Sequence, residues 1–177
     1  MIDLAMHMMD IVQNSLRAGA REIDIELIEN SNDSTLLFRV KDDGMGMDRE
    51  TLDKIADPFF TTRTTRKVGL GIPFLQMTCE QAGGRLALFS EKGKGSTVEA
   101  AYNTGHPDCL PLGDIAGYLA LLLRTNPEVR FRFTCRVDEA EFRLDSDELK
   151  EQGIELRYPQ MLGAVKEYIR ENLRGIR

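Results

Sequence analysis

The turn at residues 42–47, Asp-Asp-Gly-Met-Gly-Met, constrains the fold more than any other stretch of the chain. It follows a strand-like run at residues 35–40, where apolar side chains alternate with others. Two glycines one residue apart allow the backbone positive φ and let a flat ligand come close. The carboxylate of Asp42 is an acceptor, and the exocyclic amino group of a purine is a suitable donor for it. The alternative interpretation is a tight turn with a solvated acid.

Further motifs surround this turn in a fixed order. Upstream lies Asp-Ile-Val-Gln-Asn-Ser-Leu-Arg-Ala-Gly-Ala at 10–20; downstream lie Asp-Pro-Phe-Phe-Thr-Thr-Arg at 57–63, Gly-Leu-Gly-Ile at 69–72 and Gly-Lys-Gly-Ser-Thr at 93–97. Together they resemble the GHKL ATPase superfamily of histidine kinases, gyrase-type topoisomerases, mismatch-repair ATPases and related chaperones. The resemblance covers residues 1–103. It implies an α/β two-layer sandwich, the Bergerat fold, that binds ATP and Mg²⁺.

The first helix is expected to begin almost at the first residue, with Asp3 as its N-cap. Polar residues recur along it at spacings of three and four, which places them on one face. This polar stripe consists of His7, Asp10, Asn14 and Arg17.

The resemblance suggests roles for the stripe. Asn14 matches the residue that coordinates a Mg²⁺ ion bridging the nucleotide phosphates, and an amide oxygen plus phosphate oxygens suits this hard cation. Asp10 stands where ATPase members have a glutamate that activates water; its side chain is one methylene shorter, and the alternative is a solvated helix charge. Arg17 stands where histidine kinases commonly have a Lys or Arg that reaches a phosphate, or it is a surface arginine favoured by the helix macrodipole. His7 is either a phosphoacceptor or a structural histidine.

Residues 59–71 resemble the aromatic box and the short phosphate-closing lid of the kinase branch. Hydroxyls and cations follow Phe59 and Phe60 without an intervening acid. The glycines at the end of the lid allow hinge motion and amide donation at a helix N-terminus. The resemblance therefore predicts these nucleotide-binding residues: Asn14, Asp42, Gly44, Gly46, Thr61, Thr62, Arg63, Arg66, Gly69, Leu70, Gly71 and Thr97.

Periodicity predicts the other elements of the first 103 residues. Expected strands lie at 21–28, 35–40, 86–89 and 97–102, and expected helices at 48–55 and 72–82.

From residue 104 the composition shifts, and residues 104–111 are expected to form a linker. Residues 112–177 then form a small α+β appendage with a helix at 112–123, a strand from 129 to 137 that continues into a hairpin, and a final helix. A segment of about seventy residues is marginal alone, so we expect it to dock on the sheet. Partner binding and structural completion are both open roles for it.

Composition narrows the partners and the compartment. The net charge of −6 argues against a nucleic-acid surface. No apolar run reaches the roughly 20 residues that span a bilayer, and no signal peptide opens the chain. Cys79, Cys109 and Cys135 lack metal-ligand spacing and are typical of buried thiols in a cytoplasmic protein.

Two functions remain open, with Asp10 and Arg17 as the candidate catalytic residues. Arg17, the short lid and the lack of a dimerisation helix pair before residue 10 favour a protein kinase that phosphorylates a His or Ser/Thr of a partner protein in trans. Asp10 at the position of the base favours an ATP-gated ATPase or nucleotide-binding module. The superfamily hosts both chemistries, so its fold does not distinguish them.

Overall fold

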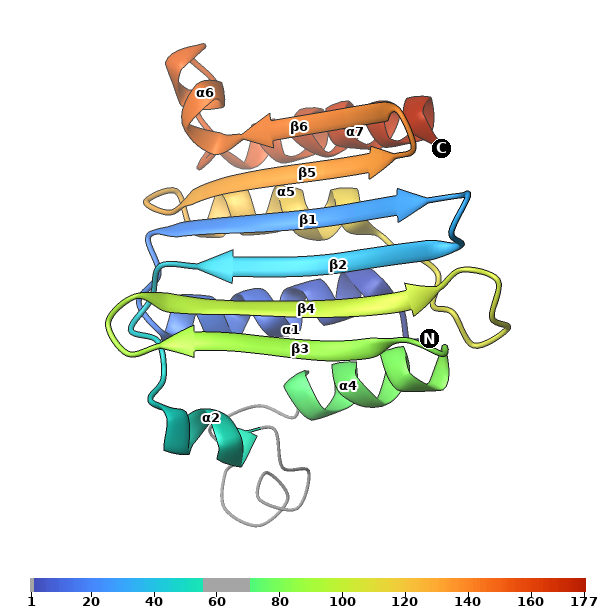
Figure 1. Cartoon of the computed structure of the whole chain (residues 1–177). Coiled ribbons are helices and arrows are strands. Elements are labelled where there is room, and N and C mark those ends of the chain that lie inside the picture. Colours follow the sequence, from blue (N-terminus) through green and yellow to red (C-terminus); the bar gives the residue numbers. More distant parts are fainter. Residues whose placement is uncertain (1, 56–70) are drawn as a thin grey trace.

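The strands of the described part form one sheet, and helices pack against one of its faces (Figure 1). The computed structural model describes residues 2–55 and 71–177. The strands of this part are β1 (Glu22–Asn30), β2 (Thr35–Asp42), β3 (Arg85–Glu91), β4 (Gly95–Asn103), β5 (Arg130–Val137) and β6 (Ala140–Asp145). Its helices are α1 (Leu4–Arg17), α2 (Arg49–Ile55), α4 (Gly71–Gln81), α5 (Ile115–Thr125), α6 (Ser146–Glu151) and α7 (Pro159–Ile176).

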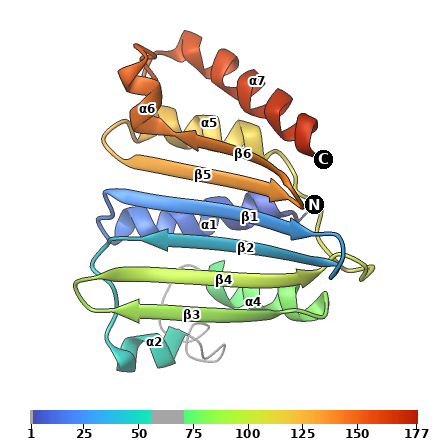
Figure 2. The ribbon, with the colours of Figure 1, turned by 45° about the horizontal axis from the view of Figure 1, so that its top comes forward.

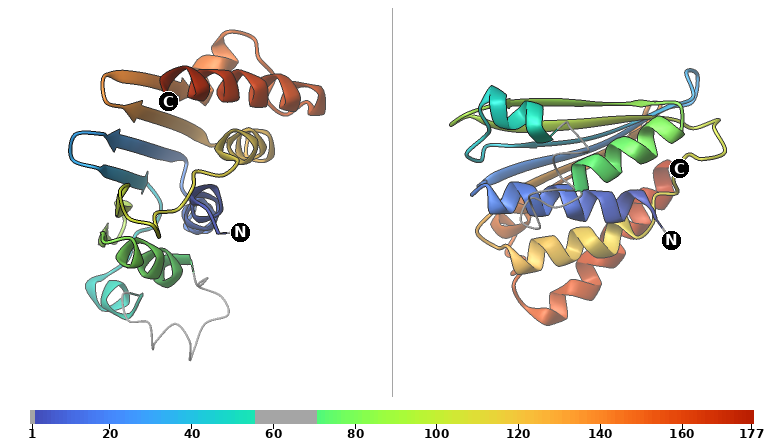
Figure 3. Two further views of the ribbon diagram at one scale, coloured as in Figure 1. Left: turned by 90° about the vertical axis from the view of Figure 1, so that its right-hand side faces the viewer. Right: turned by 90° about the horizontal axis from the view of Figure 1, so that it is seen from below.

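The described strands form one sheet in the order β3-β4-β2-β1-β5-β6. Strands β1 and β5 run parallel, and the other neighbouring pairs are antiparallel. Figure 3 shows α1, α4, α5 and α7 on one face of the sheet, whereas none of the described helices covers the other face. Figure 2 shows α4 behind β3 and β4, and α7 beside β6. The predicted α/β two-layer sandwich is confirmed.

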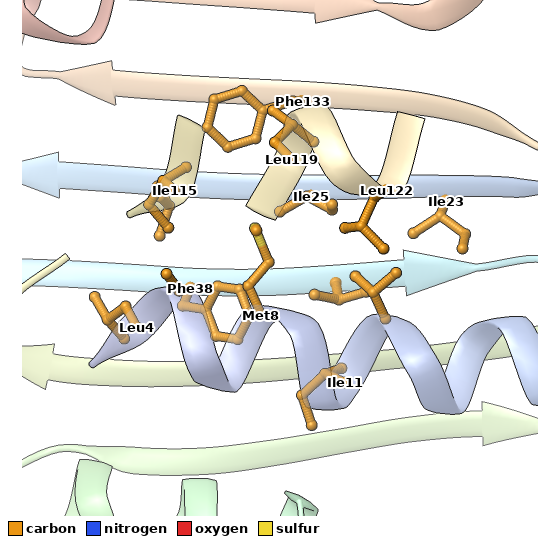
Figure 4. Close-up of a cluster of buried hydrophobic side chains, with 14 of the residues drawn as sticks. Leu4, Met8, Ile11, Ile23, Ile25, Phe38, Ile115, Leu119, Leu122 and Phe133 are labelled. Atoms are coloured by element: carbon orange, nitrogen blue, oxygen red, sulfur yellow. The ribbon is translucent and has the colours of Figure 1, made fainter. Parts of the chain in front are cut away.

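Apolar side chains of α1 and α5 fill the space beneath the sheet (Figure 4). The residues labelled there are Leu4, Met8, Ile11, Ile23, Ile25, Phe38, Ile115, Leu119, Leu122 and Phe133, and none is more than 2% exposed. Burying one such side chain stabilises a fold by ~1.5–3 kcal/mol. This cluster therefore joins the beginning and the end of the chain in one core.

Ion pairs between neighbouring strands occupy the open face of the sheet. Arg39 on β2 contacts Glu26 on β1 and lies 3.2 Å from Glu99 on β4, and Arg132 on β5 contacts Asp24 on β1. The paired side chains are only partly buried, and solvent-screened pairs of this kind contribute ~0–1 kcal/mol each. They account for charged residues on this face without making it a second core.

Residues 112–177 extend the sheet of residues 1–103. Strand β5 pairs with β1 over its whole length, and β6 continues the sheet beyond it. The expected linker at 104–111 is bonded to the first helix, because Leu4 N donates to Pro111 O at 3.0 Å. Cys109 in this segment is only half-buried, which corrects the expectation of three buried thiols; Cys79 and Cys135 are buried.

The strand that precedes the 42–47 turn is longer than predicted. The sequence places its end at residue 40, but β2 continues to Asp42, which pairs with Ile23 on β1 and Ser96 on β4. Asp42 is therefore held by a strand on each side. The predicted N-cap of α1 is confirmed, since Asp3 Oδ1 accepts from Met6 N at 2.8 Å.

Candidate functional site

A cavity of about 260 Å³ lies between α1, the end of β2 and β4. Its lining residues are Ile11, Asn14, Ser15, Arg17, Ala18, Asp42, Met45, Gly46, Met47, Thr51, Ile55, Ile72, Ser96 and Val98. Among the predicted site residues, Asn14, Arg17, Asp42 and Gly46 therefore meet at one place. The lining is mostly apolar with a few polar groups, as is typical of small-molecule sites.

The carboxylate of Asp42 is fixed by two donors. Its Oδ2 accepts from Ser15 Oγ at 2.6 Å, and its Oδ1 accepts from Gly44 N at 2.9 Å. Each carboxylate oxygen has two lone pairs, so Asp42 can still accept a hydrogen bond from a ligand. The neighbouring Lys41 lines a groove on the open face of the sheet and does not line this cavity.

Ser15 is a site residue that sequence reasoning missed. Its position among the apolar residues of α1 suggests only core packing, and it is indeed 3% exposed. However, a buried hydroxyl needs a hydrogen-bond partner. The carbonyl of Ile11 in the same helix is also within reach at 3.5 Å, so the serine alone did not identify Asp42 as its partner.

The two glycines of the turn pack closely against protein atoms, and the predicted contact of this turn with a flat ligand stays a prediction. A Cβ atom at Gly44 would lie 2.8 Å from Ala18 Cβ, and one at Gly46 would overlap the carbonyl oxygen of Glu91. Gly46 also has a φ of +65°, which L side chains rarely adopt. Both glycines allow the turn to pack closely, and only Gly46 lines the cavity.

The structure places Thr97 on the wrong face of the sheet for the predicted contact. Side chains alternate along β4, so Ser96 and Val98 line the cavity while Thr97 lines the groove on the open face. Ser96 is thus the residue of the Gly-Lys-Gly-Ser-Thr motif that reaches the site. Ser96 lies an even number of residues from the buried Val98, Ala100 and Tyr102, so the sequence already indicated that it shares their face of β4.

Further contacts hold the turn in place around the cavity. Met47 N donates to Ser90 Oγ at 2.8 Å, and this hydroxyl lies 2.7 Å from Ser96 Oγ. Asp43 accepts from the backbone N–H groups of Arg21 and Glu22 at 2.8 and 2.9 Å. Burial alone would raise the pKa of Asp43, but these backbone hydrogen bonds outweigh it and lower the pKa.

The C-terminal half of α1 brings the candidate phosphate-side residues to the first turn of α4. Asn14 is half-buried, and its Oδ1 accepts a long hydrogen bond from Arg17 Nη1 at 3.4 Å. Asp10 is exposed, yet a Cβ atom at Gly71 would lie 3.2 Å from Asp10 Cβ. Gly71 therefore allows α4 to begin directly against Asp10 and Asn14.

His7 does not belong to the exposed polar stripe. It is 1% exposed, because α4 packs over this position of α1, and its Nε2 lies 2.9 Å from Thr78 Oγ1. Burial lowers the pKa of His7, while the negative charges of Asp10 and Asp3 oppose that shift. The structural interpretation of His7 is therefore favoured over the phosphoacceptor.

The remaining predicted residues of the lid lie outside the described part of the chain: Thr61, Thr62, Arg63, Arg66, Gly69 and Leu70. Within residues 2–55 and 71–177, no three His, Cys, Asp or Glu side chains gather to hold a metal ion. A Mg²⁺ ion held by one amide oxygen, phosphate oxygens and waters needs no such cluster.

Comparisons with known proteins agree with this geometry. The model of the family "Histidine kinase-, DNA gyrase B-, and HSP90-like ATPase" matches residues 2–104. Sporulation kinase C of Bacillus subtilis is 31% identical over 51% of this chain and 21% of the kinase. Sensor histidine kinase ZraS of Escherichia coli is 30% identical over 51% of this chain and 19% of its own. The chain thus spans about a fifth of the length of these relatives.

A solved structure shows the same fold over more of the chain. The Aquifex aeolicus MutL ATPase domain complexed with ADP aligns with a TM-score of 0.52 at 20% identity. The alignment covers 86% of this chain and 67% of that domain. It reaches beyond the 103 residues of the family match and so includes part of the segment that extends the sheet.

Proposed function

Because this chain belongs to the family of histidine kinase-, DNA gyrase B- and HSP90-like ATPases, we propose that its cavity binds ATP with Mg²⁺. The observation that carries this proposal is the Asp42 carboxylate, fixed at the cavity wall by Ser15 and by the backbone of Gly44. The MutL ATPase domain of the same fold, which was solved with ADP, supports it.

Adenine would lie against the apolar lining with its amino group donating to Asp42. Two features favour a purine there: the oriented acceptor, and the apolar lining to which Ile72, Val98 and Met45 contribute. Met45 is 67% exposed, so its side chain is free to cover the base. Ser96, rather than Thr97, is the hydroxyl that we assign to this end of the ligand.

The phosphates would lie toward Asn14, Arg17 and the first turn of α4. Among the described residues that line the cavity, Asn14 is the one with a side-chain amide oxygen, which we assign to Mg²⁺. Arg17 is close enough to donate to that same atom. When Mg²⁺ is bound, it neutralises phosphate charge and orients the terminal phosphoryl group. Arg17 would then turn its guanidinium from Asn14 to a phosphate oxygen, a pairing that arginine favours.

We propose that the chain is a protein kinase that acts on a partner protein in trans. The sensor and sporulation kinases among its relatives support this class. Neither histidine of the chain suits self-phosphorylation. His7 is buried. His106 lies past the far end of β4, about 20 Å or more from Ser96 at ~3.3 Å per strand residue. We propose that the acceptor is a His, Ser or Thr of another protein.

The alternative is an ATP-gated ATPase or binding module. Asp10 favours it, because its exposed carboxylate stands beside the α4 N-terminus, where a water could approach the terminal phosphate. The free thiols support a reducing compartment for either activity, which we propose is the cytoplasm. Among the described helices, none has the length and hydropathy of a membrane span.

Incubation with γ-labelled ATP, alone and with candidate partner proteins, distinguishes the two. A kinase acting in trans should release phosphate slowly on its own, below about 0.1 per second, well under the usual enzyme range. It should transfer label to a protein when the partner is added. Asp10→Asn would lower that transfer without abolishing ATP binding, and Asp108→Asn, an exposed acid past β4, is the matched control.

Rapid turnover by the purified chain, reduced by ~10²–10⁴-fold in Asp10→Asn, would instead establish the ATPase. Failure of the wild-type chain to bind ATP in calorimetry would reject both activities.

A further inference from the structure

His7 of α1 forms a buried polar contact where α1 packs against α4. Its Nε2 lies 2.9 Å from Thr78 Oγ1, which is 3.2 Å from Tyr102 Oη on β4. The ring also packs on Phe74, with 5.2 Å between ring centroids. Three elements, α1, α4 and β4, thus meet at the Thr78 hydroxyl.

Counting protons assigns the roles in this network. The Thr78 hydroxyl has a single proton, and the Leu75 carbonyl, 3.1 Å away, can only accept it. With that proton donated to the Leu75 carbonyl, we infer that Thr78 Oγ1 accepts from His7 Nε2–H and from Tyr102 O–H. Among residues 2–55 and 71–177, no group forms a hydrogen bond with the other ring nitrogen, Nδ1, which is buried. The neutral imidazole therefore leaves only an acceptor nitrogen unpaired, whereas protonation would place an unpaired, charged N–H in the core.

The network and the candidate phosphate-side residues lie on the same pair of helices. One turn beyond His7 on α1 lies Asp10, whose Cβ would be 3.2 Å from a Cβ atom at Gly71. Phe74 and Thr78 lie one and two turns beyond Gly71 on α4. A change in the distance between the helices at His7 would therefore move Asp10 and Asn14 relative to the first turn of α4.

We propose that His7 is a positioning residue, whose hydrogen bond to Thr78 fixes α4 against α1 and so sets the phosphate side of the site. This inference rests on the proposed nucleotide function. It gives a role to a buried polar group that packing alone does not require, since a leucine of similar volume would fill the same space without an unpaired nitrogen.

The same geometry makes the site sensitive to acid. Among the described residues, the charged groups that act on His7 are Asp10 and Asp3 from α1. Tyr102 from β4 reaches His7 only through Thr78, and α4 contributes the uncharged Phe74 and Thr78. Burial lowers the pKa of His7 from its ordinary 6.5, against the opposing effect of the two acids. The folded state therefore prefers the neutral ring. Its contribution is complete above pH 6.5 and is lost as the pH falls through that value toward the lower pKa of the folded protein.

Three variants of the full chain test the proposal. His7→Leu and Thr78→Val each remove the hydrogen bond at nearly constant volume, and His7→Gln keeps a polar group near Nε2 but cannot be charged. We expect His7→Leu and Thr78→Val to weaken Mg²⁺–ATP binding by about three- to tenfold, the effect of one hydrogen bond, and His7→Gln to recover most of it. Gln76→Ala, which removes only a surface hydrogen bond of α4 to Glu80, is the control.

Calorimetric titrations at pH 7.5 and 5.5 provide the second readout. The ratio of wild-type to His7→Gln affinity at each pH cancels the titration of the nucleotide itself, and it should fall at pH 5.5. Variants that lose thermal stability but bind ATP like the wild type at both pH values would show a purely structural role and overturn the proposal. A wild-type chain that binds no ATP would overturn the proposed function, and the role of His7 with it.

Discussion

Asp42 is the residue on which we expect the recognition of adenine to depend, through its carboxylate. Asp42→Asn keeps the shape of the side chain but replaces one of its two acceptor oxygens by an NH₂ group. That group would face either the Gly44 N–H or the adenine amino group, and both of these are donors. Losing a hydrogen bond to a charged group costs about 1.5–3 kcal/mol, so ATP affinity should fall by roughly tenfold to a hundredfold. Calorimetry of the folded variant checks this.

Thr97→Val is the control for Asp42→Asn, because Thr97 lies on the open face of the sheet. It should bind ATP as the wild type does, whereas Ser96→Ala should bind more weakly. Unchanged affinity in Asp42→Asn would reject adenine recognition by this carboxylate. A larger loss in Thr97→Val than in Ser96→Ala would reject the assignment of β4 faces to the site.

At the scale of elements, the turn between β2 and α2 is held by close backbone packing. Gly46 and Gly93 both have positive φ, of +65° and +82°, but only Gly46 has no room for a Cβ atom. Gly93→Ala should cost ~1–2 kcal/mol of stability from backbone strain alone. Gly46→Ala should cost clearly more, because the turn must also move away from Glu91. Urea denaturation of both variants measures the difference, and equal midpoints would contradict it.

At the scale of the whole molecule, the parallel pairing of β1 with β5 unites the two halves of the chain. Phe133 on β5 is fully buried in the shared core, whereas Phe89 on the edge strand β3 is 57% exposed. Phe133→Ala should therefore cost ~3–5 kcal/mol, and Phe89→Ala little. Hydrogen exchange should accelerate together in β2, β4 and β5 of Phe133→Ala. Acceleration confined to β5 and β6 would show that the halves unfold separately.

The sequence alone predicted the features that depend on neighbours in the chain. Periodicity predicted most elements to within a few residues, because burial of one face repeats locally. The resemblance to the GHKL superfamily, rather than periodicity, assigned the 42–47 turn and the polar residues of α1 to one nucleotide site. Asn14, Arg17, Asp42 and Gly46 do line one cavity. The short helix α6 was missed: it has six residues, too few for a periodic pattern, and is capped by Asp145.

Tertiary structure alone decided which side chains of those elements meet. Ser15 finds Asp42 across 27 positions of sequence, and His7 is buried only because α4 packs over it. Thr97 and Ser96 are adjacent hydroxyls, and only the orientation of β4 in the sheet selects the second one for the cavity. The sequences of β5 and β1 do not indicate that these strands pair, since both show the same alternation of buried and exposed side chains. The local sequence pattern determines an element and its apolar face. Which other element packs against that face depends on residues far away in the sequence, because the whole core must pack together.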